Sequence, residues 1–248
     1  MRFRVAGYGA ALLAISSAPR LHAQDQVKTL QFVGDLGFVN ASGNSEVTSF
    51  NLGDKLVAQT GDKRHLFTQL FGFIYGRTDG ETTANSWRAS GRYEYGVSKR
   101  FYLYAQAGAE RNRFAGIARR FEEGPGVVVK AVAAPKDEFD LEGGVSLVQQ
   151  RATDGTEDNF AAGRVAALYK HKFTDKTYLA QTIEFLPNLE VSKDYRINSE
   201  TSLVAPISGN VAVKAAYVIR FDNTPLVTDT KTFKKSDRIL TTGIQITY

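Results

Sequence analysis

Charged residues recur at every second position in several stretches of this chain, and that spacing gathers their side chains on one face of an extended strand. The stretch from Trp87 to Tyr95 shows the pattern, with apolar residues at odd positions and mostly charged residues at even positions. The residues that this parity places together, from several such stretches, are Arg88, Arg92, Glu94, Glu142, Arg164, Arg196, Glu200, Lys214, Arg220 and Asp222.

Two kinds of chemistry fit such a charged face. Charges of both signs can form the wall of a water-filled pore that sorts solutes by charge and width. The same charges can instead pair across strands in a salt-bridge lattice that fills and stiffens a narrow barrel, because charges removed from water need partners. The sequence alone leaves both readings open.

The sequence contains few residues that could form a catalytic site. Beyond the first 23 residues the histidines are His65 and His171, and both lie beside short turn-like segments. A hydrolase would need a nucleophile, commonly serine, within reach of a histidine base. The absence of cysteine excludes disulfides and thiolate metal sites. We therefore predict a protein that is not an enzyme, with no catalytic, cofactor or metal site, and keep a lipid hydrolase as the least favoured alternative.

Acidic clusters in or near the predicted connections are read as solvated surface. Three of them, Asp154, Glu157 and Asp158, could hold a hard cation only weakly. The pair Glu122 and Glu123 is assigned to the same solvated class.

A basic cluster lies in the longest predicted connection and the start of the strand after it. Such a cluster suits the phosphates of lipopolysaccharide, and ordinary loop solubility explains it equally well. Its members are Lys231, Lys234, Lys235 and Arg238.

The elements that must position these side chains are strands of about ten residues with a period of two. A run of 18 or more apolar residues is absent after the N-terminal segment, which excludes a transmembrane helix. We predict twelve strands, over 31–40, 47–59, 65–76, 87–97, 101–112, 120–132, 139–150, 159–172, 177–188, 195–205, 211–222 and 238–248.

The connections between these strands alternate in length. Short turns rich in Gly, Pro, Asp or Ser follow the even-numbered strands, which places them on the side of both chain ends. Longer connections are predicted at 77–86, 113–119, 151–158 and 223–237. This asymmetry and the even strand number predict an all-β, transmembrane, antiparallel up-and-down β-barrel of about 12 strands. A soluble β-sandwich or lipocalin-like barrel is the alternative.

The first residues read as an export signal. Arg2 and Arg4 precede an apolar run that is too short to span a bilayer, and Ala23 supplies the small residue expected before a cleavage site. We predict a signal peptide over 1–23, a short periplasmic segment over 24–30 and the barrel over 31–248. Removing the three arginines of the leader lowers the formal charge from +5 to +2, so the sequence does not indicate a nucleic-acid partner.

Several stretches of the chain resemble those of the salt-induced outer membrane proteins, a domain-of-unknown-function family, over about residues 32–248. These are 42–45 (SGNS), 79–83 (DGETT), 110–114 (ERNRF), 195–203 (YRINSETSL) and 221–225 (FDNTP). The resemblance implies placement in the outer membrane of a Gram-negative bacterium and a stress-linked role. It brings no catalytic residues with it.

These observations favour a narrow passive channel for ions or small solutes, with a plugged envelope barrel as the alternative. The expected partners are outer-membrane lipid and lipopolysaccharide, together with the barrel-assembly machinery, which would engage the last strand ending at the aromatic Tyr248. We expect a monomer.

Overall fold

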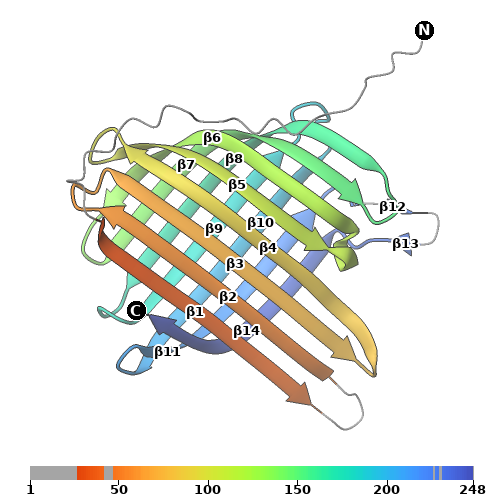
Figure 1. Ribbon diagram of the computed structural model, residues 1–248, viewed down its shortest axis with the longest axis horizontal. Helices are drawn as coiled ribbons and strands as arrows, with labels where there is room; N and C mark the ends of the chain where they lie inside the picture. The colour runs from red at the N-terminus through yellow and green to blue at the C-terminus, as the bar shows by residue number, and fades with distance from the viewer. Residues whose placement is uncertain (1–26, 42–46, 226, 229–230, 248) are drawn as a thin grey trace.

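The chain folds into one closed sheet of twelve antiparallel strands (Figure 1). The computed structural model describes residues 27–41, 47–225, 227–228 and 231–247. The barrel strands are β1 Val27–Ala41, β2 Val47–Thr60, β3 His65–Thr78, β4 Glu81–Gly96, β5 Phe101–Asn112, β6 Ile117–Ala133, β7 Asp137–Ala152, β8 Glu157–Lys172, β9 Tyr178–Pro187, β10 Tyr195–Ser208, β11 Val211–Asp222 and β14 Ser236–Thr247.

Each strand pairs with its neighbour in sequence, and β1 pairs with β14 to close the barrel. The closing seam is short, with four registered pairs from Val33↔Thr247 to Leu36↔Ile244. Closure leaves no free sheet edge, which is the condition for a sheet to reside in hydrocarbon. The predicted fold class is confirmed.

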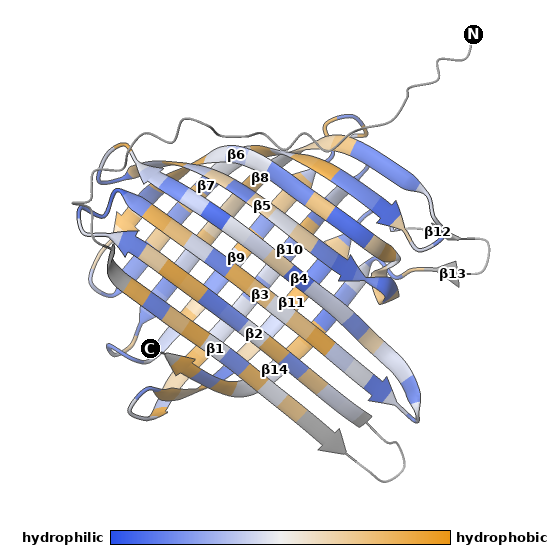
Figure 2. Cartoon of the chain, in the orientation of Figure 1, coloured by the Kyte–Doolittle hydropathy of each residue, from blue (hydrophilic) through white to orange (hydrophobic). Residues whose placement is uncertain are grey.

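The two faces of the sheet have the polarity of a membrane barrel. Apolar side chains point outward and stay exposed, as for Leu240 at 72% and Val165 at 58%, whereas Glu110, Glu142 and Arg164 are buried inside. Figure 2 shows the resulting alternation of apolar and polar residues along the strands. A soluble barrel would bury its apolar face, so this arrangement excludes the lipocalin-like alternative.

Three of the predicted long connections are shorter than expected, because the strands extend into each: β4 begins at Glu81, β6 at Ile117 and β8 at Glu157. The β3–β4 connection reduces to a tight turn at Asp79 and Gly80, whose φ angles of 49° and 80° suit a hairpin of the I′ type. After β5 the chain makes a single short 3-10 helix, η1 Arg113–Ala115. A tilted strand crosses a bilayer in about 9–11 residues, whereas β6 has 17, so the ladder extends past the apolar band.

The barrel has two distinct rims. At one rim β1 begins and β14 ends, and tight turns join the strands; we call it the terminal rim. In one of these turns the Asp62 carboxylate accepts hydrogen bonds from the Thr60 hydroxyl (2.5 Å) and from the Arg64 backbone N–H (2.9 Å). These hydrogen bonds lower the pKa of Asp62. The opposite rim, here the loop rim, carries the connection 188–194 and the segment after β11, with the hairpin β12 Val227–Thr228 and β13 Lys231–Thr232.

The predicted leader 1–23 and Tyr248 lie outside the described residues. β1 begins at Val27, so strand pairing starts within the segment predicted to be periplasmic. In the described part of the chain no helix is long and apolar enough to cross a membrane, a finding that concerns helices alone.

The seam yields a stability prediction. A Cβ at Gly243 would overlap the Leu36 carbonyl on the neighbouring strand, whereas a Cβ at Gly72 meets nothing within 4 Å. We expect Gly243→Ala to destabilise the refolded barrel by about 1–3 kcal/mol and Gly72→Ala to change stability little. Urea unfolding in lipid vesicles measures both; equal midpoints for the two variants would contradict the importance of the seam.

Candidate functional site in the barrel lumen

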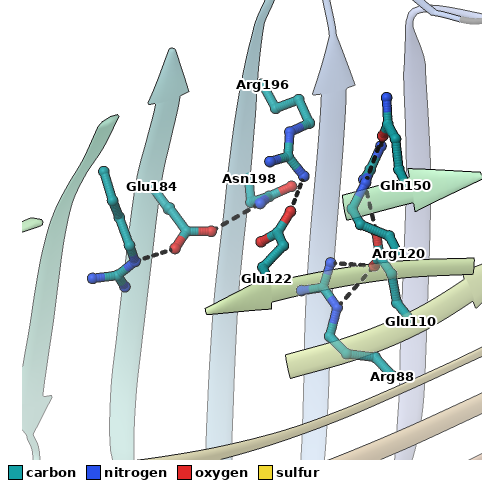
Figure 3. Close-up of polar contacts among 9 residues, drawn as sticks. Arg88, Glu110, Arg120, Glu122, Gln150, Glu184, Arg196 and Asn198 are labelled. Atoms are coloured by element: carbon teal, nitrogen blue, oxygen red, sulfur yellow. Dashed lines mark hydrogen bonds and ion pairs between the residues drawn. The ribbon is translucent and has the colours of Figure 1, made fainter. Parts of the chain in front are cut away.

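A row of four polar side chains crosses four adjacent strands inside the barrel near the loop rim. Arg88 on β4, Glu110 on β5, Arg120 on β6 and Gln150 on β7 are directly opposite one another in register. Arg88 Nη2 donates to Glu110 Oε2 (2.8 Å), Arg120 Nη1 donates to Glu110 Oε1 (2.7 Å), and Arg120 Nε and Nη2 donate to Gln150 Oε1 (3.0 and 2.8 Å). Figure 3 shows this row.

A second network is centred on Glu142 of β7. Its two oxygens accept from Arg92 Nη1 and Nη2 (2.8 Å each), and Oε2 also accepts from Arg164 Nη1 (2.5 Å). Arg164 Nε continues to Glu184 Oε1 (2.6 Å), whose second oxygen accepts from Asn198 Nδ2 (2.9 Å). Each carboxylate in this chain of contacts is shared, which is how buried charges are kept satisfied.

The Tyr104 ring lies at the middle of this second network. Its hydroxyl accepts from Arg164 Nη1 (2.9 Å), and the Arg92 guanidinium carbon lies 3.9 Å from the ring centroid, a cation–π contact. A Cβ at Gly126 or Gly144 would overlap this tyrosine. These two glycines therefore make the room that the ring occupies.

Some of the ion pairs join strands that are not neighbours. Arg196 Nη1 on β10 donates to Glu122 Oε1 on β6 (2.5 Å), four strands away along the closed sheet, as Figure 3 shows. Arg92 on β4 similarly reaches Glu142 on β7. Such contacts pass through the lumen itself, so the side of the barrel formed by β4–β10 is filled by polar side chains.

The side formed by β1–β3, β11 and β14 is more open. Lys214 on β11 pairs with Asp35 Oδ2 on β1 (2.9 Å) and lies 3.9 Å from Glu200 Oε1. Lys55 on β2 faces inward directly opposite Leu70 on β3, and both side chains are exposed. An inward side chain that is exposed borders on water-accessible space.

The structure places all ten charged residues predicted from parity on the inner face, but it separates them into two groups. Arg88, Arg92, Glu94, Glu142, Arg164 and Arg196 belong to the filled side, with Arg92 Nε 2.9 Å from Glu94 Oε1. Lys214 lies on the open side, Glu200 on β10 borders that side 3.9 Å from Lys214, and Arg220 and Asp222 line a cavity at the loop rim. Whether these residues act on a solute stays a prediction.

Sequence reasoning missed the acidic and basic partners on the neighbouring strands. The prediction that Glu122 belongs to solvated surface is wrong, because Glu122 lies within β6 and pairs across the lumen with Arg196. The signal was available in the register, since Glu110 and Arg120 follow the same parity as Arg88 once the strands are aligned. The residues missed are Tyr104, Glu110, Arg120, Glu122 and Glu184.

Among the predicted lipopolysaccharide-contact residues whose side chains the structure describes, Lys234 and Lys235 lie apart from Arg238. Lys234 and Lys235 line the cavity at the loop rim, and Lys235 Nζ donates to Asn223 Oδ1 (3.2 Å). Arg238, exposed, alternates with inward residues on β14 and so lies on the outer face. The side chain of Lys231 lies outside the described residues.

The two histidines take part in contacts at the terminal rim. His65 Nδ1 lies 2.6 Å from the Tyr93 hydroxyl, and His171 Nδ1 lies 2.8 Å from Asp137 Oδ1. Within the described ranges neither imidazole bonds a serine hydroxyl, and no group of three or more His, Asp or Glu side chains could hold a metal ion. That the chain is not an enzyme stays a prediction.

Comparison with known proteins supplies the family. Residues 34–248 match the model described as "Protein of unknown function, DUF481". This chain belongs to the DUF481 family. A curated relative, "Uncharacterized protein YdiY" of Escherichia coli (strain K12), is 25% identical over 202 residues, which cover 78% of this chain and 75% of the relative. The resemblance to a domain-of-unknown-function family is confirmed, and induction by salt stays a prediction.

Solved structures with a similar fold are bacterial outer-membrane-type barrels. The NanC porin is 7% identical with a TM-score of 0.48, covering 88% of this chain and 98% of that one. The translocator domain of autotransporter NalP from Neisseria meningitidis is 13% identical with a TM-score of 0.46, covering 88% and 86%. The anion-selective porin from Comamonas acidovorans is 9% identical with a TM-score of 0.41, covering 89% and 99%. Likenesses of this degree carry no argument about solutes.

The lattice yields a second stability prediction. Glu142 accepts from the guanidinium groups of Arg92 and Arg164, so Glu142→Gln removes the charge that they share, while each arginine keeps a second acid, Glu94 or Glu184. We expect a loss of about 1.5–3 kcal/mol in the free energy of unfolding, because hydrogen bonds to charged groups are weakened. Glu157→Gln is the control, because its pair with Arg119 is exposed and is worth about 1 kcal/mol or less. Equal losses in urea unfolding would show that burial of the lattice has no energetic consequence.

Proposed function

We propose that this protein is an exported outer-membrane barrel that acts as a narrow passive channel for small ions. The observation that carries the proposal is a set of inward side chains that stay accessible although they belong to the lumen. Leu70 is 44% exposed, the Glu200 side chain is 47% exposed, and Lys55 is exposed as well. The exposed apolar outer face supports placement in a membrane.

Charged side chains of both signs recur along the accessible side of the lumen. Lys55 faces inward from β2, and Lys214 on β11 pairs with Asp35 on β1 and lies 3.9 Å from Glu200 Oε1. Nearer the loop rim, Arg220 and Asp222 on β11 line the cavity. Such a file of mixed charges lets an ion exchange one set of neighbours for the next as it moves, which is what conduction requires.

The mixed sign of this file favours weak charge selectivity. Lys55 and Lys214 are balanced by Asp35 and Glu200 on the same side of the lumen. Because the other side is closed by the lattice, the path is narrow and suits hydrated ions rather than large solutes. The family resemblance adds osmotic or salt stress as the setting in which such a conductance is useful.

Planar-bilayer recordings on the refolded protein test the proposal. We expect discrete conductance steps in potassium chloride. Lys55→Glu should move the reversal potential in a salt gradient toward cation selectivity, because it inverts a charge beside the path. The matched control is Lys99→Glu, which changes a turn residue at the terminal rim. Absence of steps at every salt concentration would contradict the channel.

A second candidate is a braced envelope barrel that does not conduct. The observation that favours it is the ion pairing between non-neighbouring strands, above all Arg196 with Glu122. Pairs of this kind resist relative movement of opposite walls, which would stiffen the barrel under osmotic load.

Removing that pair as a unit separates the two candidates. The double variant Arg196→Ala with Glu122→Ala leaves neither partner charged and alone. If the wild-type protein conducts along the open side, the double variant should keep conductance within about twofold, since the pair lies off the path. A silent wild-type protein that gains conductance in the double variant would instead establish the braced barrel.

A further inference from the structure

The lumen opens at the loop rim into a small cavity of about 60 Å³. That volume exceeds what a single water molecule needs, which is about 10–15 Å³ on the same measure. Its floor is the row headed by Arg88, and its upper wall comes from Lys234 and Lys235 after β11. The cavity therefore joins residues of the barrel wall to residues of the longest loop-rim connection.

The charges around this cavity are unbalanced. The lining cations are Arg88, Arg120, Arg196, Arg220, Lys234 and Lys235, and the lining acids are Glu110, Asp222 and Asp237. Six positive and three negative charges leave a formal excess of +3. Counting Glu122, which bonds Arg196 from just outside the lining, the excess is still +2. Concentrated positive charge in a partly enclosed space attracts anions.

Two of these cations have donors to spare. The Arg220 guanidinium makes no side-chain hydrogen bond within the described ranges; Asp237, directly opposite on β14, balances part of its charge, and Arg88 adds a second positive charge beside it. Arg196 Nη2 is buried and has no hydrogen-bond partner within the described part of the chain. An unpartnered buried donor is costly, so such a group normally has a ligand or solvent to bind.

We propose that this cavity binds a small tetrahedral oxyanion, of the phosphate or sulfate class. Guanidinium groups present planar sets of donors that match oxyanion oxygens, and several such groups converge here. Arg88 is positioned by Glu110, so its orientation is fixed before the anion arrives, while the guanidinium of Arg220 has no hydrogen bond of its own to give up among the residues that the structure describes. This inference goes beyond conduction and stands whether or not the barrel conducts.

Titration with inorganic phosphate tests the site on the refolded full chain in detergent micelles. Isothermal titration calorimetry should give saturable binding that chloride at equal ionic strength does not reproduce. Arg220→Gln should weaken that binding by roughly tenfold, the effect of losing one charge-assisted contact. Arg220 lies directly opposite Asp237 on β14, and Asp237 keeps Lys234 as a neighbouring cation when Arg220 is removed, so the variant should fold.

Two further variants keep the experiment decisive. Arg238→Gln removes a cation on the outer face of the next strand, beside Ile219 in register, and should leave phosphate binding unchanged. Lys234→Gln, on the loop side of the cavity, should weaken binding as Arg220→Gln does. No saturable binding by the wild-type protein, or equal weakening by Arg238→Gln, would overturn the proposal.

The oxyanion can be free in solution or carried by a lipid headgroup, and a competition experiment distinguishes these sources. Lipopolysaccharide that displaces phosphate, and fails to do so after dephosphorylation, identifies the headgroup as the source. Intact lipopolysaccharide that leaves phosphate bound identifies the free anion. Either result supports the site, provided that Arg220→Gln weakens binding. Bilayer recordings play no part here, so failure of the channel proposal leaves this test intact.

Discussion

A sheet that faces hydrocarbon must pair all of its backbone donors and acceptors, and closure is the way it does so. In this protein closure depends on the short seam between β1 and β14. Closure also determines which way the side chains point. When the apolar side chains of a strand face outward to lipid, the alternate side chains face the interior, which must be packed with polar groups or filled with water. This alternation explains why the lumen is lined with charged residues.

The interior solves the problem differently on its two sides. Along β4–β10 the carboxylates of Glu110 and Glu142 are each shared by two arginines, and Tyr104 fills the space left by two glycines. Along β1–β3, β11 and β14 the charges are sparser and more accessible. One wall is thus packed with paired charges, while the side chains of the other stay accessible. The two candidate functions rest on these two different walls.

The loop rim differs from both sides. There strands such as β6 are longer than a membrane crossing needs, and Lys234 and Lys235 from the loop line the cavity at the end of the lumen. A surplus of cations therefore collects at the loop-rim mouth of the lumen. Lys234 and Lys235 therefore line the same positively charged cavity as the arginines of the lumen, whereas Arg238 lies on the outer, lipid-facing side of the sheet.

The sequence by itself determined the strand number, the antiparallel order and the inward parity of residues such as Arg92 and Arg196. Period-two alternation is a local property, so residues within one strand reveal it. It could not show that Arg196 meets Glu122, or that Arg92 meets Glu142, because those pairs join strands that are distant around the barrel. It also overestimated three connections, since polar residues near Asp79 continue the ladder instead of ending it. Barrel register and closure, which are tertiary properties, decided which charges meet, which stay accessible and which face the same cavity.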